Sequence, residues 1–201
     1  MKKASLIILL VIIGIVITLI PIVIIWGIKV NNRMITMEEN VNKAWSNVEN
    51  VYQRRADLIP NLVSTVKGYA EHETSTFEAV VNARAKATSI SVNPDNMTAD
   101  QLKEFQQAQN EVGGALGRLI AISESYPELK ANENFKELQA QLEGTENRIS
   151  VERRNFNEDA SKYNTYIRKF PQSIIAGMRG FEKKPYFEAE EGANKAPKVE
   201  F

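Results

Sequence analysis

The sequence predicts an all-α protein in which an N-terminal transmembrane helix is followed by an antiparallel bundle of long helices. Three observations support this fold class. The chain begins with an almost unbroken aliphatic stretch, its remainder repeats apolar residues at intervals of three and four, and no alternating run of β-branched and aromatic residues occurs. With 201 residues, the chain holds enough material for one core beside this first helix.

Residues 6–28 carry the strongest signal, because the stretch LIILLVIIGIVITLIPIVIIWGI contains 23 residues and no charge. At about 1.5 Å per residue, it can cross a hydrocarbon core of about 30 Å. A cleaved signal peptide has a shorter apolar core of about 7–15 residues and a small-residue cleavage site, so we expect an uncleaved anchor. Lysines precede the stretch, and Lys29 and Arg33 follow it, so the charge rule leaves the orientation open.

An apolar series at heptad spacing predicts a helix from about residue 31 to about residue 88. Arg55 and Thr65 interrupt this series. Pro60 lacks the amide that would bond to the carbonyl four residues earlier, so we expect a kink or a restart there, with Asp57 as the cap of the restarted helix. The series consists of Met37, Val41, Ala44, Val48, Val51, Leu58, Leu62 and Tyr69.

A second helix is predicted after a loop over residues 88–97, because Thr98-Ala-Asp-Gln101 has the form of a capping box. Tyr126-Pro127 ends this helix. Three glycines within it each weaken a helix by up to about 1 kcal/mol, so we expect a neighbouring backbone to approach closely at Gly113, Gly114 and Gly117. The predicted apolar seam is Leu102, Phe105, Gln109, Val112, Leu116, Leu119 and Ile122.

A third helix is predicted to open at the cap-like tetrad Asn134-Phe-Lys-Glu137. Pro171 kinks or restarts it, and Gly177 and Gly180 are candidate stops. With the first helix counted as one piece or as two about Pro60, the bundle has three long or four shorter helices. The helical spacing covers Leu138, Leu142, Thr145, Ile149, Phe156, Tyr163, Ile167 and Phe170, and we expect the aromatic stripe of Phe156, Tyr163, Tyr166 and Phe170 to be core.

The chain is therefore predicted to have three parts: an anchor with short flanks at 1–30, a helical bundle at 31–181 and an extended tail at 182–201. The tail carries large apolar groups that must be buried somewhere. It could add to the sheet edge of a partner, as a C-terminus does in a PDZ-type groove, or dock on the chain's own bundle. The candidate docking residues are Tyr186, Phe187, Val199 and Phe201.

Several strings in this chain resemble the LemA family. They are Arg54-Arg-Ala-Asp-Leu-Ile-Pro-Asn-Leu-Val-Ser-Thr-Val-Lys-Gly-Tyr-Ala70, Gly144-Thr-Glu-Asn-Arg-Ile149, Tyr163-Asn164, Phe170-Pro171 and Pro197-x-Val199-x-Phe201. The resemblance extends over nearly the whole chain. It implies a bacterial single-pass membrane protein with an all-α bundle, which we expect in the inner membrane, and it brings no agreed enzymatic activity, no cofactor and no catalytic residue.

Composition excludes several kinds of chemistry. The 25 basic and 25 acidic residues give a net charge of +0, so no broad basic field exists to gather nucleic acid. No cysteine is present, and His72 is the one histidine, which excludes thiolate metal sites and a di-iron site built from two Glu-x-x-His units. We expect no catalytic, cofactor or metal residue, and we interpret Glu71-His72-Glu73 as a solvated face.

The motif around Arg55 combines a charge in an apolar seam with a helix break. Arg55 must either extend to solvent or meet a buried acid from another helix, for which Glu146 is a candidate. We interpret the motif as a polar lock on helix register in preference to a ligand site. The candidate interaction or structural residues are Arg54, Arg55, Asp57, Pro60, Asn61, Glu146 and Arg148.

The function expected from the sequence is protein–protein interaction or scaffolding at the bacterial cell membrane, by binding and not by catalysis. Two alternatives stay open: an accessory subunit of a membrane peptidase or hydrolase, and a sensor of a small ligand. A pocket with convergent charges would favour a ligand, and a large exposed apolar patch would favour a protein partner. The partner's identity, the oligomeric state and the side of the membrane that holds the bundle are not determined by the sequence.

Overall fold

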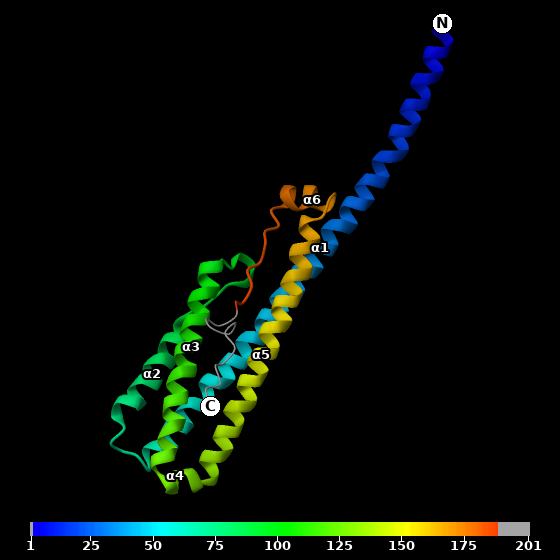
Figure 1. The fold of residues 1–201 in the computed structure, drawn as a ribbon. Helices are drawn as coiled ribbons and strands as arrows, with labels where there is room; N and C mark the ends of the chain where they lie inside the picture. Colours follow the sequence, from blue (N-terminus) through cyan, green and yellow to red (C-terminus); the bar gives the residue numbers. More distant parts are fainter. Residues whose placement is uncertain (1, 189–201) are drawn as a thin grey trace, which may run out of the picture. The chain divides into compact units, whose positions relative to one another are not determined.

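Residues 2–188, which the computed structural model describes, form six α-helices, two short 3-10 helices and no strand, and this confirms the all-α class (Figure 1). The chain divides into two compact units, which are described separately. The first unit is Met1–Asn40 with Ser161–Lys183, and the second is Val41–Ala160 with Lys184–Phe201. The helices are α1 (Lys2–Lys67), α2 (Thr74–Ser89), η1 (Pro94–Asn96), α3 (Ala99–Ala121), η2 (Ile122–Ser125), α4 (Pro127–Ala131), α5 (Glu133–Arg168) and α6 (Gln172–Arg179).

In the first unit, α1 is helical through Pro21 and exposes a long run of aliphatic side chains. The stretch of α1 that begins at Ile13 is long and apolar enough, by length and composition, to cross a membrane. Among the described side chains of α1, the first buried ones are Val30 and Met34, which follow the aliphatic run. Tyr163 of α5 is fully buried in the same unit, and its hydroxyl lies 3.5 Å from Oε1 of Glu38.

The end of α5 and the start of α6 follow the sequence prediction in part. A new helix, α6, begins directly after Pro171, as predicted. Gly180 ends α6 and adopts the left-handed conformation with φ of 76°. Gly177 lies inside α6 and does not stop it. Phe170 was predicted as core, but its side chain is 81% exposed.

In the second unit, parts of α1 and α5 pack with α2, α3 and α4 around one apolar core. α2 and α3 are antiparallel neighbours (Figure 1). A cluster of aromatic rings extends this core, with centroids 5.2 Å apart for Trp45 and Phe105 and 5.7 Å apart for Trp45 and Phe156. Such edge-on ring pairs add about 0.5–1.5 kcal/mol each beyond the area that they bury.

The helix does not restart at Pro60, so that alternative of the prediction is wrong. α1 continues through Pro60 to Lys67, and the chain turns between Gly68 and Glu73 instead. Pro60 frees the carbonyl of Ala56, but Nε of Arg84 in α2 donates to this oxygen at 2.8 Å. A side chain from the next helix thus replaces the missing amide, which removes much of the penalty for proline inside a helix.

The buried seam of α1 in the second unit also differs from the predicted one. One row, which includes Val41, Val48 and Leu62, is buried as predicted. In the other row, Val51 and Leu58 are only half-buried, and the buried residues lie one position later. Larger side chains bury more apolar area, at about 25 cal/mol per Å², so the helix turns this row inward: Trp45, Tyr52, Ile59 and Val66.

The N-terminal caps of α3 and α5 can be compared with the caps predicted from the sequence. Thr98 and Gln101 form the expected capping box of α3. For α5 the cap lies two residues before the predicted tetrad, because Oδ1 of Asn132 accepts from the amide of Phe135 at 2.9 Å. The helix therefore begins at Glu133.

The glycines of α3 do not admit a neighbouring backbone, so that prediction is wrong. A Cβ at Gly113 or Gly114 would meet only an arginine nitrogen at 3.9 Å, and a Cβ at Gly117 would meet nothing within 4 Å. Gly113 and Gly114 instead line a groove, which is described below.

Candidate functional site

Arg55 is the polar centre of the second unit and is only 3% exposed. Its Nη1 donates to Oε2 of Glu146 at 2.9 Å, so α1 and α5 meet through the ion pair that the sequence named. Its Nη2 donates to the backbone oxygen of Gln109 at 2.9 Å and to Oε1 of the same residue at 2.7 Å. One guanidinium therefore joins three helices by directional bonds.

The partners of Arg55 differ in their contact with water. Gln109 is buried, whereas the Glu146 side chain is 58% exposed and so is not the buried acid that a seam arginine was expected to meet. The guanidinium carbon also lies 5.1 Å from the ring centroid of Tyr52, within the range of a cation–π contact. Burial raises the pKa of the Tyr52 phenol.

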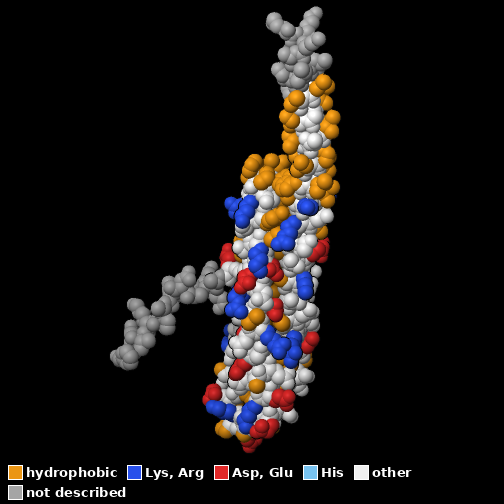
Figure 2. All heavy atoms as spheres, turned by 90° about the vertical axis from the view of Figure 1, so that its right-hand side faces the viewer, with side chains coloured by type: hydrophobic (Ala, Val, Ile, Leu, Met, Phe, Trp, Pro, Cys, Tyr) orange, Lys and Arg blue, Asp and Glu red, His pale blue; other side chains and the backbone are white. Residues whose placement is uncertain are grey.

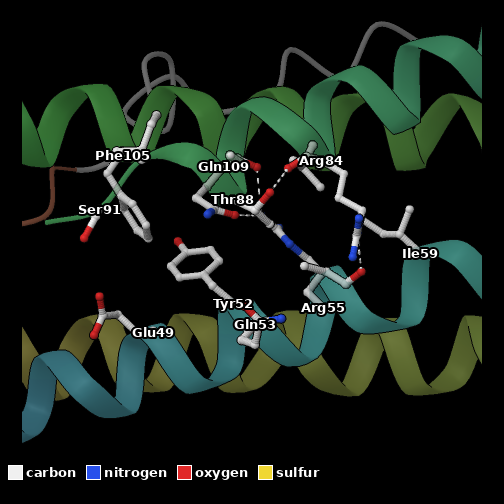
Figure 3. Close-up of a pocket in the computed structure, with 14 residues that line it drawn as sticks. Glu49, Tyr52, Gln53, Arg55, Ile59, Arg84, Thr88, Ser91, Phe105 and Gln109 are labelled. Atoms are coloured by element: carbon white, nitrogen blue, oxygen red, sulfur yellow. Dashed lines mark hydrogen bonds between the residues drawn. The ribbon is translucent and has the colours of Figure 1, made fainter.

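Between α1, α2 and α3 lies a cavity of about 230 Å³, and Figure 3 shows side chains from these helices turned toward it. Burial raises the pKa of Glu49 at one edge. The cavity thus brings an amide, a phenol, two guanidinium groups and a carboxylate close together. Its polar lining includes Glu49, Tyr52, Arg55, Arg84 and Gln109.

On the other side of the Arg55 side chain, a larger groove of about 1240 Å³ follows α3. Gly113 and Gly114 form part of its lining, together with polar side chains of α3 and with Glu146, Pro185, Tyr186 and Glu188. Because two glycines carry no side chain there, backbone of α3 is open to an approaching chain. We call this feature the α3 groove.

The remaining residues of the predicted motif do not converge on either cavity. Arg54, Asp57, Pro60 and Asn61 are all exposed along α1. Asp57 accepts from Nε2 of Gln53 at 2.7 Å within the same helix and caps nothing. Arg148 is exposed on α5. Among the seven residues of this motif, the structure therefore brings only Arg55 and Glu146 together.

From Lys184 onward, the predicted tail belongs to the second unit. Phe187 is buried and stacks on Trp45 with ring centroids 6.0 Å apart. Asn157 holds its backbone on both sides, accepting from the Phe187 amide at 2.8 Å and donating to its carbonyl at 2.9 Å. Tyr186 is 44% exposed and lines the α3 groove. Val199 and Phe201 lie outside the described residues.

Lys184 was missed by the sequence interpretation, although it fixes the same segment. Its Nζ donates at 2.9 Å to each of the carbonyls of Pro94 and Asp95, and the side chain is buried. Gln106 and Arg153 both donate to the Glu188 carbonyl, at 2.9 and 3.0 Å. A lysine in a charged, proline-containing stretch gives no local sign of such a contact.

Within residues 2–188, no group of three or more histidine, cysteine, aspartate or glutamate side chains is placed to hold a metal ion. Glu71 and His72 lie in the turn after α1 and are exposed.

The fold and the site define an all-α bundle protein with a long apolar N-terminal helix and a buried arginine that joins three helices. Residues 44–201 match the model of the LemA family, and the chain belongs to this family.

Three relatives illustrate the similarity. The chain is 31% identical over 174 residues to "Magnetosome protein MamQ 2" of Paramagnetospirillum magneticum and 31% identical over 173 residues to "Magnetosome protein MamQ" of Magnetospirillum gryphiswaldense; in both cases the match covers 78% of this chain and 64% of the relative. It is 23% identical over 160 residues to "Protein LemA" of Metamycoplasma hominis, with 80% of this chain and 69% of that protein covered. The chain thus spans less than two thirds of the length of the magnetosome proteins.

Proposed function

We propose that the chain is a single-pass protein of the bacterial inner membrane that acts by binding another protein and not by catalysis. α1 would be the anchor, because its exposed aliphatic stretch matches the thickness of a hydrocarbon core. The second unit would be the part that binds. An accessory subunit of a membrane peptidase or hydrolase would be one form of such a protein.

The α3 groove is the observation that carries the binding role. Its volume of about 1240 Å³ exceeds the range of about 300–1,000 Å³ typical of small-molecule pockets, which favours a peptide segment as its occupant. Its lining is largely polar, and the open backbone at Gly113 and Gly114 allows an extended chain to come close.

The second unit exposes few large apolar side chains among its described residues, and this supports a polar mode of binding. Those that the structure describes lie on different segments of the chain, unlike the continuous patch that marks an apolar protein interface. Among the described residues of this unit, they are Tyr69, Val81, Val151 and Tyr186. We therefore expect recognition by hydrogen bonds and charge, with contributions from Glu146 and Tyr186.

Photo-crosslinking in cells tests this proposal. A photo-reactive amino acid is placed singly at Asn110 or Tyr186, which line the groove, and at Asn134, an exposed residue of α5 that does not. We expect one protein to be captured from both groove positions and not from position 134. Capture of only lipid and self, or equal capture from all three positions, would contradict the proposal.

Two leucine substitutions provide matched controls on one helix. Gly114→Leu fills the groove, where the new Cβ would lie 3.9 Å from the Arg118 guanidinium, and Gly117→Leu places the same side chain in open space outside the groove. Both keep α3 helical, since leucine favours a helix more than glycine does. Crosslinking from position 110 should fall with Gly114→Leu and persist with Gly117→Leu.

The cavity beside Tyr52 supports a second candidate, a sensor of a small polar ligand. Convergent polar groups around about 230 Å³ fit a molecule of a few heavy atoms. The measurement is ligand-observed NMR of a library of small polar metabolites with the purified chain. Binding that is lost in Thr88→Trp, which would close the cavity rim, and retained in Gly114→Leu would favour the sensor over the protein-binding role.

A further inference from the structure

The outer face of α6 is strongly apolar. Phe170 and Met178 are 81% and 80% exposed, and Ile174 between them is 54% exposed. Ile174 and Met178 are four positions apart and so fall on one face of α6, and Phe170 lies in the turn that leads into this helix. Gly177, also exposed, adds no side chain that would interrupt this face. We call Phe170, Ile174 and Met178 the α6 face.

Contacts within the first unit fix α6 against α1 at the end of its apolar stretch. Cδ1 of Ile175 lies 3.6 Å from the position of a Cβ at Gly27, and Nε of Arg179 donates to Oδ1 of Asn31 at 3.1 Å. The α6 face is therefore level with the point where α1 changes from aliphatic to charged residues. Hydrophobic side chains of both helices form one continuous area there (Figure 2).

Basic side chains border the same area. Residues 168–181 contain three basic and no acidic residue, namely Arg168, Lys169 and Arg179. All three are exposed, as are Lys29 and Arg33 on α1. An apolar face beside lysine and arginine is the pattern of a helix that lies in the headgroup region of an anionic bilayer.

We infer that α6 is a second membrane contact, lying in the interface of the bilayer that α1 crosses, with the α6 face among the acyl chains and the basic residues at anionic phosphate groups. This inference rests on the proposed membrane anchor. Lipid is favoured over a protein occupant because the α6 face and the exposed aliphatic surface of α1 form one continuous apolar area. Trp26, half-buried beside Gly27, occupies the level at which tryptophans favour the interface.

Spin labelling of the full chain tests the inference. The chain has no cysteine, so Ile17→Cys, Ile174→Cys, Met178→Cys and Val81→Cys each provide one attachment site. Val81 is the control, because it is an exposed apolar residue of α2 with 51% exposure, similar to Ile174. Each labelled chain is reconstituted in vesicles of phosphatidylethanolamine and phosphatidylglycerol, and its collision rates with oxygen and with a water-soluble nickel chelate are measured.

We expect the oxygen-to-nickel ratio to be highest at position 17, lower at 174 and 178, and lowest at 81, since an interfacial helix is shallower than the middle of a span. A ratio at 174 and 178 equal to that at 81, with position 17 still in lipid, would overturn the inference alone. Low collision rates with both reagents, or spin–spin broadening, would also overturn it by indicating protein or a second copy. An aqueous ratio at position 17 would instead contradict the anchor.

Discussion

The two units of this chain treat their apolar side chains in opposite ways. The first unit exposes most of its aliphatic residues between Leu10 and Ile28, whereas the second buries Trp45, Phe105 and Phe156 at its centre. Exposure in one unit and burial in the other are both favourable if the two units meet different solvents, because exposed apolar surface is unfavourable only in contact with water. The contrast teaches that one continuous helix, α1, can carry two surface patterns suited to lipid and to water.

The strongest way to test this contrast is to remove one large side chain from each unit. Trp45→Ala should lower the free energy of unfolding by about 3–5 kcal/mol, because it opens a cavity in a packed core. Val23→Ala, on the exposed part of α1, should change it by less than about 0.5 kcal/mol. Urea unfolding of the detergent-solubilised chain, followed by circular dichroism, measures both values. Equal losses would mean that position 23 is also packed in protein.

Within the second unit, the partners of Arg55 should differ in importance. Arg55→Ala should lower the free energy of unfolding by about 3 kcal/mol, since it leaves the buried Gln109 side chain without its donor. Glu146→Gln should cost less than about 1 kcal/mol, because that carboxylate is largely in water. The same unfolding measurement applies. A larger loss for Glu146→Gln would place the stabilisation in the ion pair instead.

The bond between Arg84 and the Ala56 carbonyl can be isolated by a double-mutant cycle with Pro60. Arg84→Ala should cost about 1–2 kcal/mol, because it leaves a partly buried carbonyl without a donor. In the Pro60→Ala background the loss should be clearly smaller, since the restored amide serves that carbonyl. Additive losses in the cycle would show that Arg84 acts through other contacts.

The smallest effect concerns two tyrosines and is confined to alkaline pH. Burial raises the pKa of Tyr52 in the second unit, and burial together with Glu38 raises the pKa of Tyr163 in the first. A raised pKa in the folded state means stabilisation that is complete below the unfolded value of about 10 and lost as pH rises above it. Tyr52→Phe and Tyr163→Phe should each reduce this alkaline loss, measured by thermal unfolding between neutral pH and pH 11. An unchanged pH profile would show that neither phenol titrates differently on folding.

Features that depend on neighbours in sequence could be predicted well. The capping box at Thr98 needs only four residues, and the helical period of α3 identified its buried seam. The contact of Arg55 with Glu146 could also be named, because a charge in an apolar seam requires a partner. These cases share a local pattern or a strong energetic demand.

Features that depend on distant residues could not be predicted. The continuity of α1 through Pro60 rests on Arg84, and the fixed position of the 184–188 segment rests on Lys184 and the carbonyls of η1. Nothing near these residues in sequence indicates such bonds. The α3 groove likewise arises from the arrangement of four chain segments, so Gly113 and Gly114 could be noticed but not explained from the sequence.

The central claim, that the first unit meets lipid and the second meets water, can be tested with the two native tryptophans. In Trp45→Phe only Trp26 emits, and in Trp26→Phe only Trp45 emits. After reconstitution in vesicles that contain brominated phospholipids, the account predicts strong quenching of Trp26 and none of Trp45, which is fully buried in its own unit. Emission from Trp26 that bromine does not quench, or equal quenching of both residues, would contradict it.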